Sequence, residues 1–156
     1  AMLLRDTTRG LEPAGGTLSQ ALGIVNGAVF SDLDGDGFPE LIVATEWGPV
    51  RVFKNQQGKF SEATESLGLG GLTGLWQGVA TGDFDGDGRT DIVATNWGLN
   101  SSLSPSLINP PRLYYHFTDS SVPTSLILAA WDDRLKQYLP TRDLPSLFRE
   151  IGRAHV

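Results

Sequence analysis

An internal repeat constrains the fold of this chain more than any other feature. Residues 27–37 match residues 78–88, and Asp32 and Asp83 in these segments stand 51 residues apart. A second match, between residues 42–48 and 92–98, has an offset of 50, which indicates a one-residue insertion or deletion before the shared tryptophan. A period near 50 residues is typical of repeat architectures, in which each unit buries its apolar face against its neighbours.

Each unit has the pattern of four short strands. Residues 23–31 are small and apolar, 41–45 are mostly β-branched or Ala, and 50–53 alternate with a period of two. A polar turn at 55–58 precedes a fourth strand that opens at Phe60. Four strands in about 50 residues is the content of one propeller blade. We therefore predict an all-β fold, a partial β-propeller of about two to three four-stranded blades.

The repeats predict a segmental organisation. The expected segments are the end of a preceding blade and a connector (1–22), a blade with an acidic loop (23–72), a second blade with an acidic loop and a Pro/Ser loop (73–112), a degenerate third repeat with a C-terminal extension (113–149), and a tail (150–156). Because propellers usually have four to eight blades, we expect an incomplete ring whose remaining blades belong to a longer chain. Asp143 is a candidate cap for a short helix. One permitted choice of codons for the tail resembles a common sequencing adapter. We therefore expect residues 150–156 to be adapter read-through and not protein sequence.

Two acidic turns carry the candidate chemistry. Each places carboxylates at positions 1, 3, 5 and 9 and a Gly at position 6. Four carboxylates so close together repel one another unless a cation lies between them. Alternating oxygen ligands, a carbonyl at position 7 and a bend at the Gly suit Ca²⁺, which takes six to eight oxygens, better than Mg²⁺. The carboxylates concerned are Asp32, Asp34, Asp36 and Glu40 in the first turn and Asp83, Asp85, Asp87 and Asp91 in the second.

Other interpretations of these turns are weaker. An EF-hand needs a bidentate Glu at position 12, where this chain has Val43 and Ala94, and helices where strands are expected. Solvated turns are also rich in Asp and Gly, but two copies in matched register favour cation binding. A glycosidase pair would need the oxygens that chelation occupies. In the third unit Asp119 is the only acid at the corresponding positions, so we expect no cation there.

Composition excludes several other classes of function. The chain has no Cys, which rules out disulfides, thiolate zinc sites and Cys nucleophiles. The net charge of −6 and the lack of a basic cluster argue against nucleic acid as a partner. No apolar run reaches the ~20 residues of a membrane span. Eight of the 18 acids lie in the two turns, and no acid and base pair stands out elsewhere, so we do not expect an enzyme.

The two units resemble FG-GAP or VCBS repeats, the blades of integrin-α-type propellers, over about residues 4–131. Residues 96–100, 111–115 and 138–144 resemble the branch that precedes an ASPIC/UnbV domain, the cartilage acidic protein-like group. The resemblance implies one Ca²⁺ on each intact loop. The implied ligands are Asp32, Asp34, Asp36, the Phe38 carbonyl and Glu40 in the first loop, and Asp83, Asp85, Asp87, the Arg89 carbonyl and Asp91 in the second.

These observations lead to a calcium-binding propeller module for extracellular recognition or adhesion, with an unknown protein or carbohydrate as its ligand. The alternative is the propeller portion of a secreted carbohydrate-active or other enzyme. Because loops on such modules suit extracellular Ca²⁺, roughly 0.1 to 1 mM, we expect a secreted, periplasmic or cell-surface protein.

Four tryptophans are further candidates. Trp47, Trp97 and Trp131 recur after a strand in each unit, and Trp76 stands just before the second repeat. We expect these rings to fill the gaps between blades; a sugar-stacking platform is the alternative.

Overall fold

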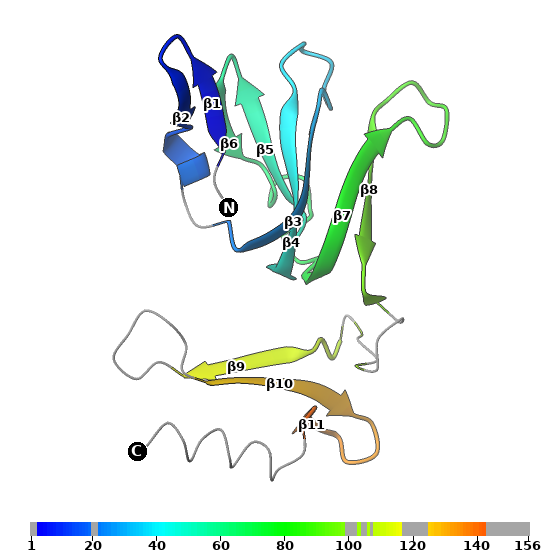
Figure 1. Ribbon diagram of the computed structural model, residues 1–156. Helices are drawn as coiled ribbons and strands as arrows, with labels where there is room; N and C mark the ends of the chain where they lie inside the picture. The colour runs from blue at the N-terminus through cyan, green and yellow to red at the C-terminus, as the bar shows by residue number, and fades with distance from the viewer. Residues whose placement is uncertain are drawn as a thin grey trace. The chain divides into compact units, whose positions relative to one another are not determined.

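A computed structural model of the chain describes residues 3–19, 22–98, 103, 106, 108–116 and 125–142 (Figure 1). The chain divides into two compact units, residues 1–97 and 98–156, which we describe separately. Within the described residues the structure consists of strands joined by turns and loops, and no sheet is closed. The all-β prediction is confirmed, and the open sheets are consistent with a partial β-propeller. The helix expected after Asp143, the third acidic position and the tail fall outside the described residues.

The strands of the first unit follow the predicted order. Their bounds are β1 (Leu4–Thr7), β2 (Gly10–Pro13), β3 (Ile24–Ser31), β4 (Glu40–Gly48), β5 (Arg51–Gln56), β6 (Lys59–Glu62), β7 (Gly74–Gly82) and β8 (Asp91–Asn96), with the 3-10 turn η1 (Gly16–Ser19) after β2. β3, β4, β5 and β6 pair antiparallel in chain order, which confirms the predicted four-stranded blade. β7 and β8 form a second antiparallel pair. β1 and β2 make a separate hairpin.

Both faces of β4 are buried. Residues 40–45 all have exposed fractions of 4% or less, which explains why this strand is a continuous apolar run and not an alternating one. On one face, Leu41 and Val43 pack with Phe53, Leu18 and Leu22. On the other face, Ile42 packs with two valines of the β4–β5 hairpin, and apolar side chains of β7 and β8 cover this cluster. The β7–β8 pair therefore stacks on the first blade, as expected for adjacent repeat units.

The strand register corrects the sequence alignment of the two units. Ala28 pairs with Val43 in the first unit, and Val79 pairs with Ala94 in the second. These pairs are 51 residues apart, so the offset of 51 continues through the strand where the sequence match suggested 50. At the end of β4, Trp47 sits in a bulge of the β4–β7 pairing at a φ of 61°.

The tryptophan prediction is correspondingly wrong in part. Trp97 donates its backbone N–H to the Leu75 carbonyl at 3.3 Å, the position that Glu46 holds opposite Ile24 in the first unit. Trp47 and Trp97 therefore occupy different places in their units, and both are exposed, at 39% and 53%. A one-residue shift in a strand turns a side chain to the opposite face, which a motif alignment does not reveal.

The other two tryptophans make packing contacts. Trp76, on β7, packs against the apolar cluster between β4–β5 and β7–β8, as predicted. Trp131 belongs to the second unit, in which β9 (Arg112–His116), β10 (Ser125–Asp132) and β11 (Gln137–Pro140) form an antiparallel sheet in the order β9–β10–β11. The Trp131 ring meets Tyr138 edge-on, with centroids 5.3 Å apart, and Arg112 lies 3.9 Å over the same tyrosine. No helix in the described part of the chain is long and apolar enough to cross a membrane.

Candidate metal centres

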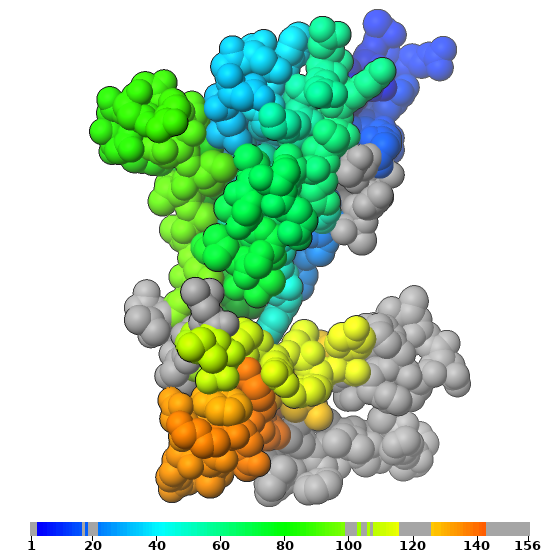
Figure 2. All heavy atoms as spheres, turned by 180° about the vertical axis from the view of Figure 1, so that it is seen from behind, coloured from blue at the N-terminus to red at the C-terminus, as the bar shows by residue number. Residues whose placement is uncertain are grey.

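The two acidic turns form loops of equal length in equivalent places. Residues 32–40 connect β3 to β4, and residues 83–91 connect β7 to β8. Figure 1 and the reverse view in Figure 2 show both loops at the same end of the first unit. Because strands flank each loop, the structure excludes the helix–loop–helix arrangement of an EF-hand.

The aspartate at position 1 organises the first loop. Asp32 accepts backbone hydrogen bonds through Oδ1 from Gly35 at 2.8 Å and Asp36 at 3.1 Å, and through Oδ2 from Gly37 at 2.9 Å. Gly35 and Gly37 adopt positive φ angles of 77° and 85°, a region that side chains disfavour. The backbone therefore wraps around one carboxylate only because glycine occupies positions 4 and 6.

The second loop repeats this arrangement atom for atom. Asp83 accepts through Oδ1 from Gly86 at 2.7 Å and Asp87 at 3.1 Å, and through Oδ2 from Gly88 at 2.9 Å. The two glycines have φ angles of 80° and 83°. Two loops thus fold by the same local rule, although the residues between the acids differ.

Three carboxylates converge in each loop. In each group, one oxygen from every residue lies within 4.8 Å of the others, close enough to share one cation. The groups are Asp32, Asp34 and Asp36 in the first loop, and Asp83, Asp85 and Asp91 in the second. Six of the eight predicted carboxylates are therefore brought together. The second loop uses position 9 where the first uses position 5.

Position 9 has a structural role in both loops. Glu40 is buried, with 2% of its surface exposed, and its Oε2 accepts from the Leu33 amide at 2.9 Å. Its Oε1 accepts from the Asn55 amide at 3.4 Å, so this carboxylate lies outside the group of three in its loop. Asp91 accepts from the Phe84 amide at 3.0 Å in the same manner but also belongs to its group.

Comparison with known proteins agrees with this geometry. Residues 32–94 match the family profile of the FG-GAP-like repeat. The matched segment begins at the first aspartate of one loop and ends on the strand that follows the other, so this part of the chain is similar to an FG-GAP-like repeat. No curated protein and no solved structure gave a significant match to the chain.

Each loop of the FG-GAP-like segment also holds one cationic side chain. Lys54 of β5 lies 3.1 Å from Asp34 Oδ2, and this hydrogen bond raises the pKa of the lysine. Arg89 pairs with Asp87 through its Nε at 2.8 Å and its terminal nitrogen, and this pairing lowers the pKa of the aspartate. Asp87 is therefore engaged by its own loop, and it lies outside the second group of three.

The residues at position 7 lie beside the carboxylates. Phe38 donates its backbone N–H to Asp36 at 2.8 Å, and Arg89 donates its own to Asp87 at 2.9 Å. The family resemblance implies that their carbonyl oxygens bind the cation, and this stays a prediction.

Sequence reasoning missed other residues that shape or contact the acidic loops. Repetition of the Asp-Gly-Asp-Gly pattern could have indicated a role for Gly35 and Gly86 at position 4. No spacing rule could have indicated Lys54 or Asn55, because both come from β5 and approach the first loop only through sheet pairing.

Proposed function

We propose that this chain is a Ca²⁺-binding β-propeller repeat module that serves extracellular recognition or adhesion, with no catalysis of its own. The observation that carries the proposal is the pair of carboxylate groups at corresponding places in two loops of equal length. Convergent carboxylates without sulfur or imidazole favour hard divalent cations, and an irregular set of oxygens suits Ca²⁺ better than Mg²⁺.

The proposed ligand sets extend beyond the converging carboxylates. We include the carbonyl oxygens of Phe38 and Arg89, the carboxylates of Glu40 and Asp87, which lie outside the converging groups, and water. Asp32 and Asp83 would couple the ion to the loop backbone, since each already accepts three amide hydrogen bonds. A bound cation would thus stiffen the connection between β3 and β4 and the connection between β7 and β8.

The recognition role and the location follow from this metal. Extracellular modules bind Ca²⁺ at roughly 0.1 to 1 mM, so we propose a secreted, periplasmic or cell-surface protein with a protein or carbohydrate ligand. The motifs around residues 96–100 and 111–115 support the ASPIC/UnbV-associated branch as the source of these blades.

Calorimetric titration of the full chain with Ca²⁺ tests the metal sites. We expect two sites for wild type and one for each of the variants Asp34→Asn and Asp85→Asn, because each variant removes one converging carboxylate. Asp6→Asn, an exposed-hairpin change outside both loops, is the matched control and should keep two sites. Fewer than two sites in wild type, or unchanged stoichiometry in the loop variants, would contradict the proposal.

A further inference from the structure

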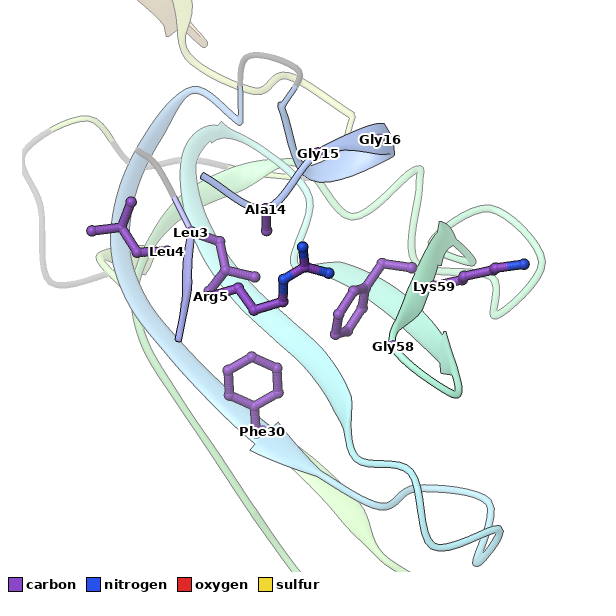
Figure 3. A pocket seen from close by; sticks show the side chains of 10 residues that line it. Leu3, Leu4, Arg5, Ala14, Gly15, Gly16, Phe30, Gly58 and Lys59 are labelled. Carbon is purple, nitrogen blue, oxygen red and sulfur yellow. The ribbon is translucent and has the colours of Figure 1, made fainter. Parts of the chain in front are cut away.

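A groove separate from the acidic loops lies in the first unit (Figure 3). It has a volume of about 610 Å³, within the range of small-molecule sites. Its lining comes from the β1–β2 hairpin, the segment before and at η1, strand β3, and strand β6 with the turn before it. The lining residues include Leu3, Arg5, Ala14, Phe30, Lys59 and Phe60. None of them belongs to either acidic loop.

The walls of the groove are largely apolar. The rings of Phe30 and Phe60 lie with centroids 6.3 Å apart and planes inclined by 59°. Phe60 and Leu3 pack on the core of the first blade, which fixes this wall. Phe30 is 51% exposed, so an apolar group placed against its ring would remove unfavourable surface from water.

A cationic side chain points into this apolar groove. Figure 3 shows the Arg5 side chain extending into it between Ala14 and Phe30. Within the described residues the Arg5 side chain makes no hydrogen bond or ion pair, although its backbone belongs to the β1–β2 ladder. Glu12 lies opposite Arg5 in the β1–β2 ladder, yet no ion pair closes between them. Lys59 adds a second positive charge at the rim, and none of the described residues that line the groove is acidic.

We propose that this groove binds a small organic carboxylate with an apolar body, such as an arylalkyl monocarboxylate. The planar guanidinium of Arg5 offers two parallel donors to the carboxylate, a charge-assisted pairing that a neutral group cannot replace. The body of the ligand lies against Phe30 and Phe60. The groove selects an anion although the whole chain carries a net charge of −6, because the lining charges are all positive.

The test uses the full chain and two matched probes, 3-phenylpropionate and its neutral amide 3-phenylpropanamide. Binding is followed by chemical-shift titration, with and without Ca²⁺. We expect the carboxylate to bind about tenfold more tightly than the amide, from the usual size of a charged hydrogen bond. Its affinity should fall as ionic strength rises, since Arg5 is exposed to solvent. Equal affinity for both probes, or no binding of the carboxylate, would overturn the proposal.

Variants separate the guanidinium from a general effect of charge. Arg5→Gln should weaken 3-phenylpropionate binding about tenfold and leave the amide unchanged. Arg9→Gln makes the same chemical change on the same hairpin outside the groove and should have no effect. Glu12→Gln should tighten binding, because it removes the carboxylate opposite Arg5. If Arg9→Gln weakened binding as much as Arg5→Gln, the groove would not be the site. The result does not depend on Ca²⁺ binding by the acidic loops.

Discussion

Glu40 shows how one residue can serve the fold at a place where the sequence suggests only a ligand. Its carboxylate is buried and accepts amide hydrogen bonds from Leu33 in its own loop and from Asn55 on β5. Those two amides lie far apart in the sequence, so a single side chain fixes the end of the loop to the third strand of the blade.

Replacement of Glu40 should therefore be costly even without metal. Glu40→Ala is expected to lower the free energy of unfolding by about 2 to 3 kcal/mol, because two backbone amides lose a charged acceptor. Urea denaturation in the presence of a chelator measures this effect independently of any ion. Glu65→Ala, at an exposed position, should cost less than about 0.5 kcal/mol. Equal costs for the two variants would contradict a structural role for Glu40.

At the residue scale the sequence predicts most of the candidate site. Positions 1 and 3 converge in both loops, as the spacing indicates. Positions 5 and 9 differ because two contacts are not shared by the loops: the Arg89 side chain holds Asp87, whereas the Asn55 backbone amide of β5 holds Glu40. The carboxylate spacing that the two turns have in common does not indicate either contact.

The alternation of β8 separates two adjacent side chains by burial. Ile92 packs against the cluster on the first blade, while its neighbour Val93 is 46% exposed. The motif alignment would instead match Val93 with the buried Val43, which the observed register does not support.

This register makes a paired prediction. Ile92→Ala should lower the free energy of unfolding by about 2 kcal/mol or more, because it leaves a cavity beside Ile42 and Val52. Val93→Ala should change it by less than about 0.5 kcal/mol, since this side chain faces solvent. Urea denaturation of the two variants checks the order. A larger cost for Val93→Ala would mean that the motif alignment, and not the ladder, gives the true register.

A network of polar side chains joins strands β5 and β6 of the first blade. Arg51 on β5 makes two hydrogen bonds with Glu62 on β6, at 2.8 and 2.7 Å. The buried Thr64 donates to the same carboxylate at 3.0 Å and accepts from the Val52 amide at 3.1 Å. The pairing with Arg51, followed by the Thr64 hydroxyl, holds the pKa of Glu62 below its usual 4.5.

The stability that Glu62 adds should depend on pH. Because its pKa is lower in the folded state, the contribution is complete above pH 4.5 and is lost as pH falls through the folded value. Glu62→Gln should therefore destabilise the protein by about 0.5 to 1 kcal/mol at pH 7, and the difference should shrink in acid. Urea denaturation of both proteins at pH 7 and pH 3 measures it. A gap that stays constant across this range would rule out the ionised pair as its source.

At the element scale the sequence predicts the strands of the first blade well. The apolar run of β4, the alternation of β5 and the polar turn before β6 each have a single consistent interpretation. The alignment of one blade on the other was harder to predict. Residues 42–45 and 92–95 have the same sequence, but the strand register matches Val43 with Ala94, which shifts the offset from 50 to 51. Only the ladder pairs, which depend on loop length and bulge position, fix that shift.

At the scale of the whole molecule, Ca²⁺ binding should change both the net charge of the chain and the free energy of unfolding. The chain carries a net charge of −6, and two Ca²⁺ ions would reduce it to −2. A ligand that binds only the folded state stabilises it in proportion to the logarithm of its concentration.

Calcium should therefore stabilise the first unit. At a Ca²⁺ concentration about 100 times the dissociation constant, each site should add about 2.7 kcal/mol to the free energy of unfolding. Urea denaturation with Ca²⁺ or with a chelator measures the gain, and Mg²⁺ at equal concentration should give less. The double variant Asp34→Asn, Asp85→Asn should lose most of it. Equal stabilisation by Ca²⁺ in this double variant and in wild type would show that the loops are not responsible.

The burial of β4 on two faces has a consequence for how such a unit can change over evolutionary time. Leu41 and Ile42 are neighbours in sequence, yet they belong to separate cores on opposite sides of one strand. Any backbone shift that accommodates a new side chain in one core displaces the other. Substitutions in the two cores are therefore coupled. A substitution that moves the β4 backbone on one face should be accompanied by a compensating substitution on the other face.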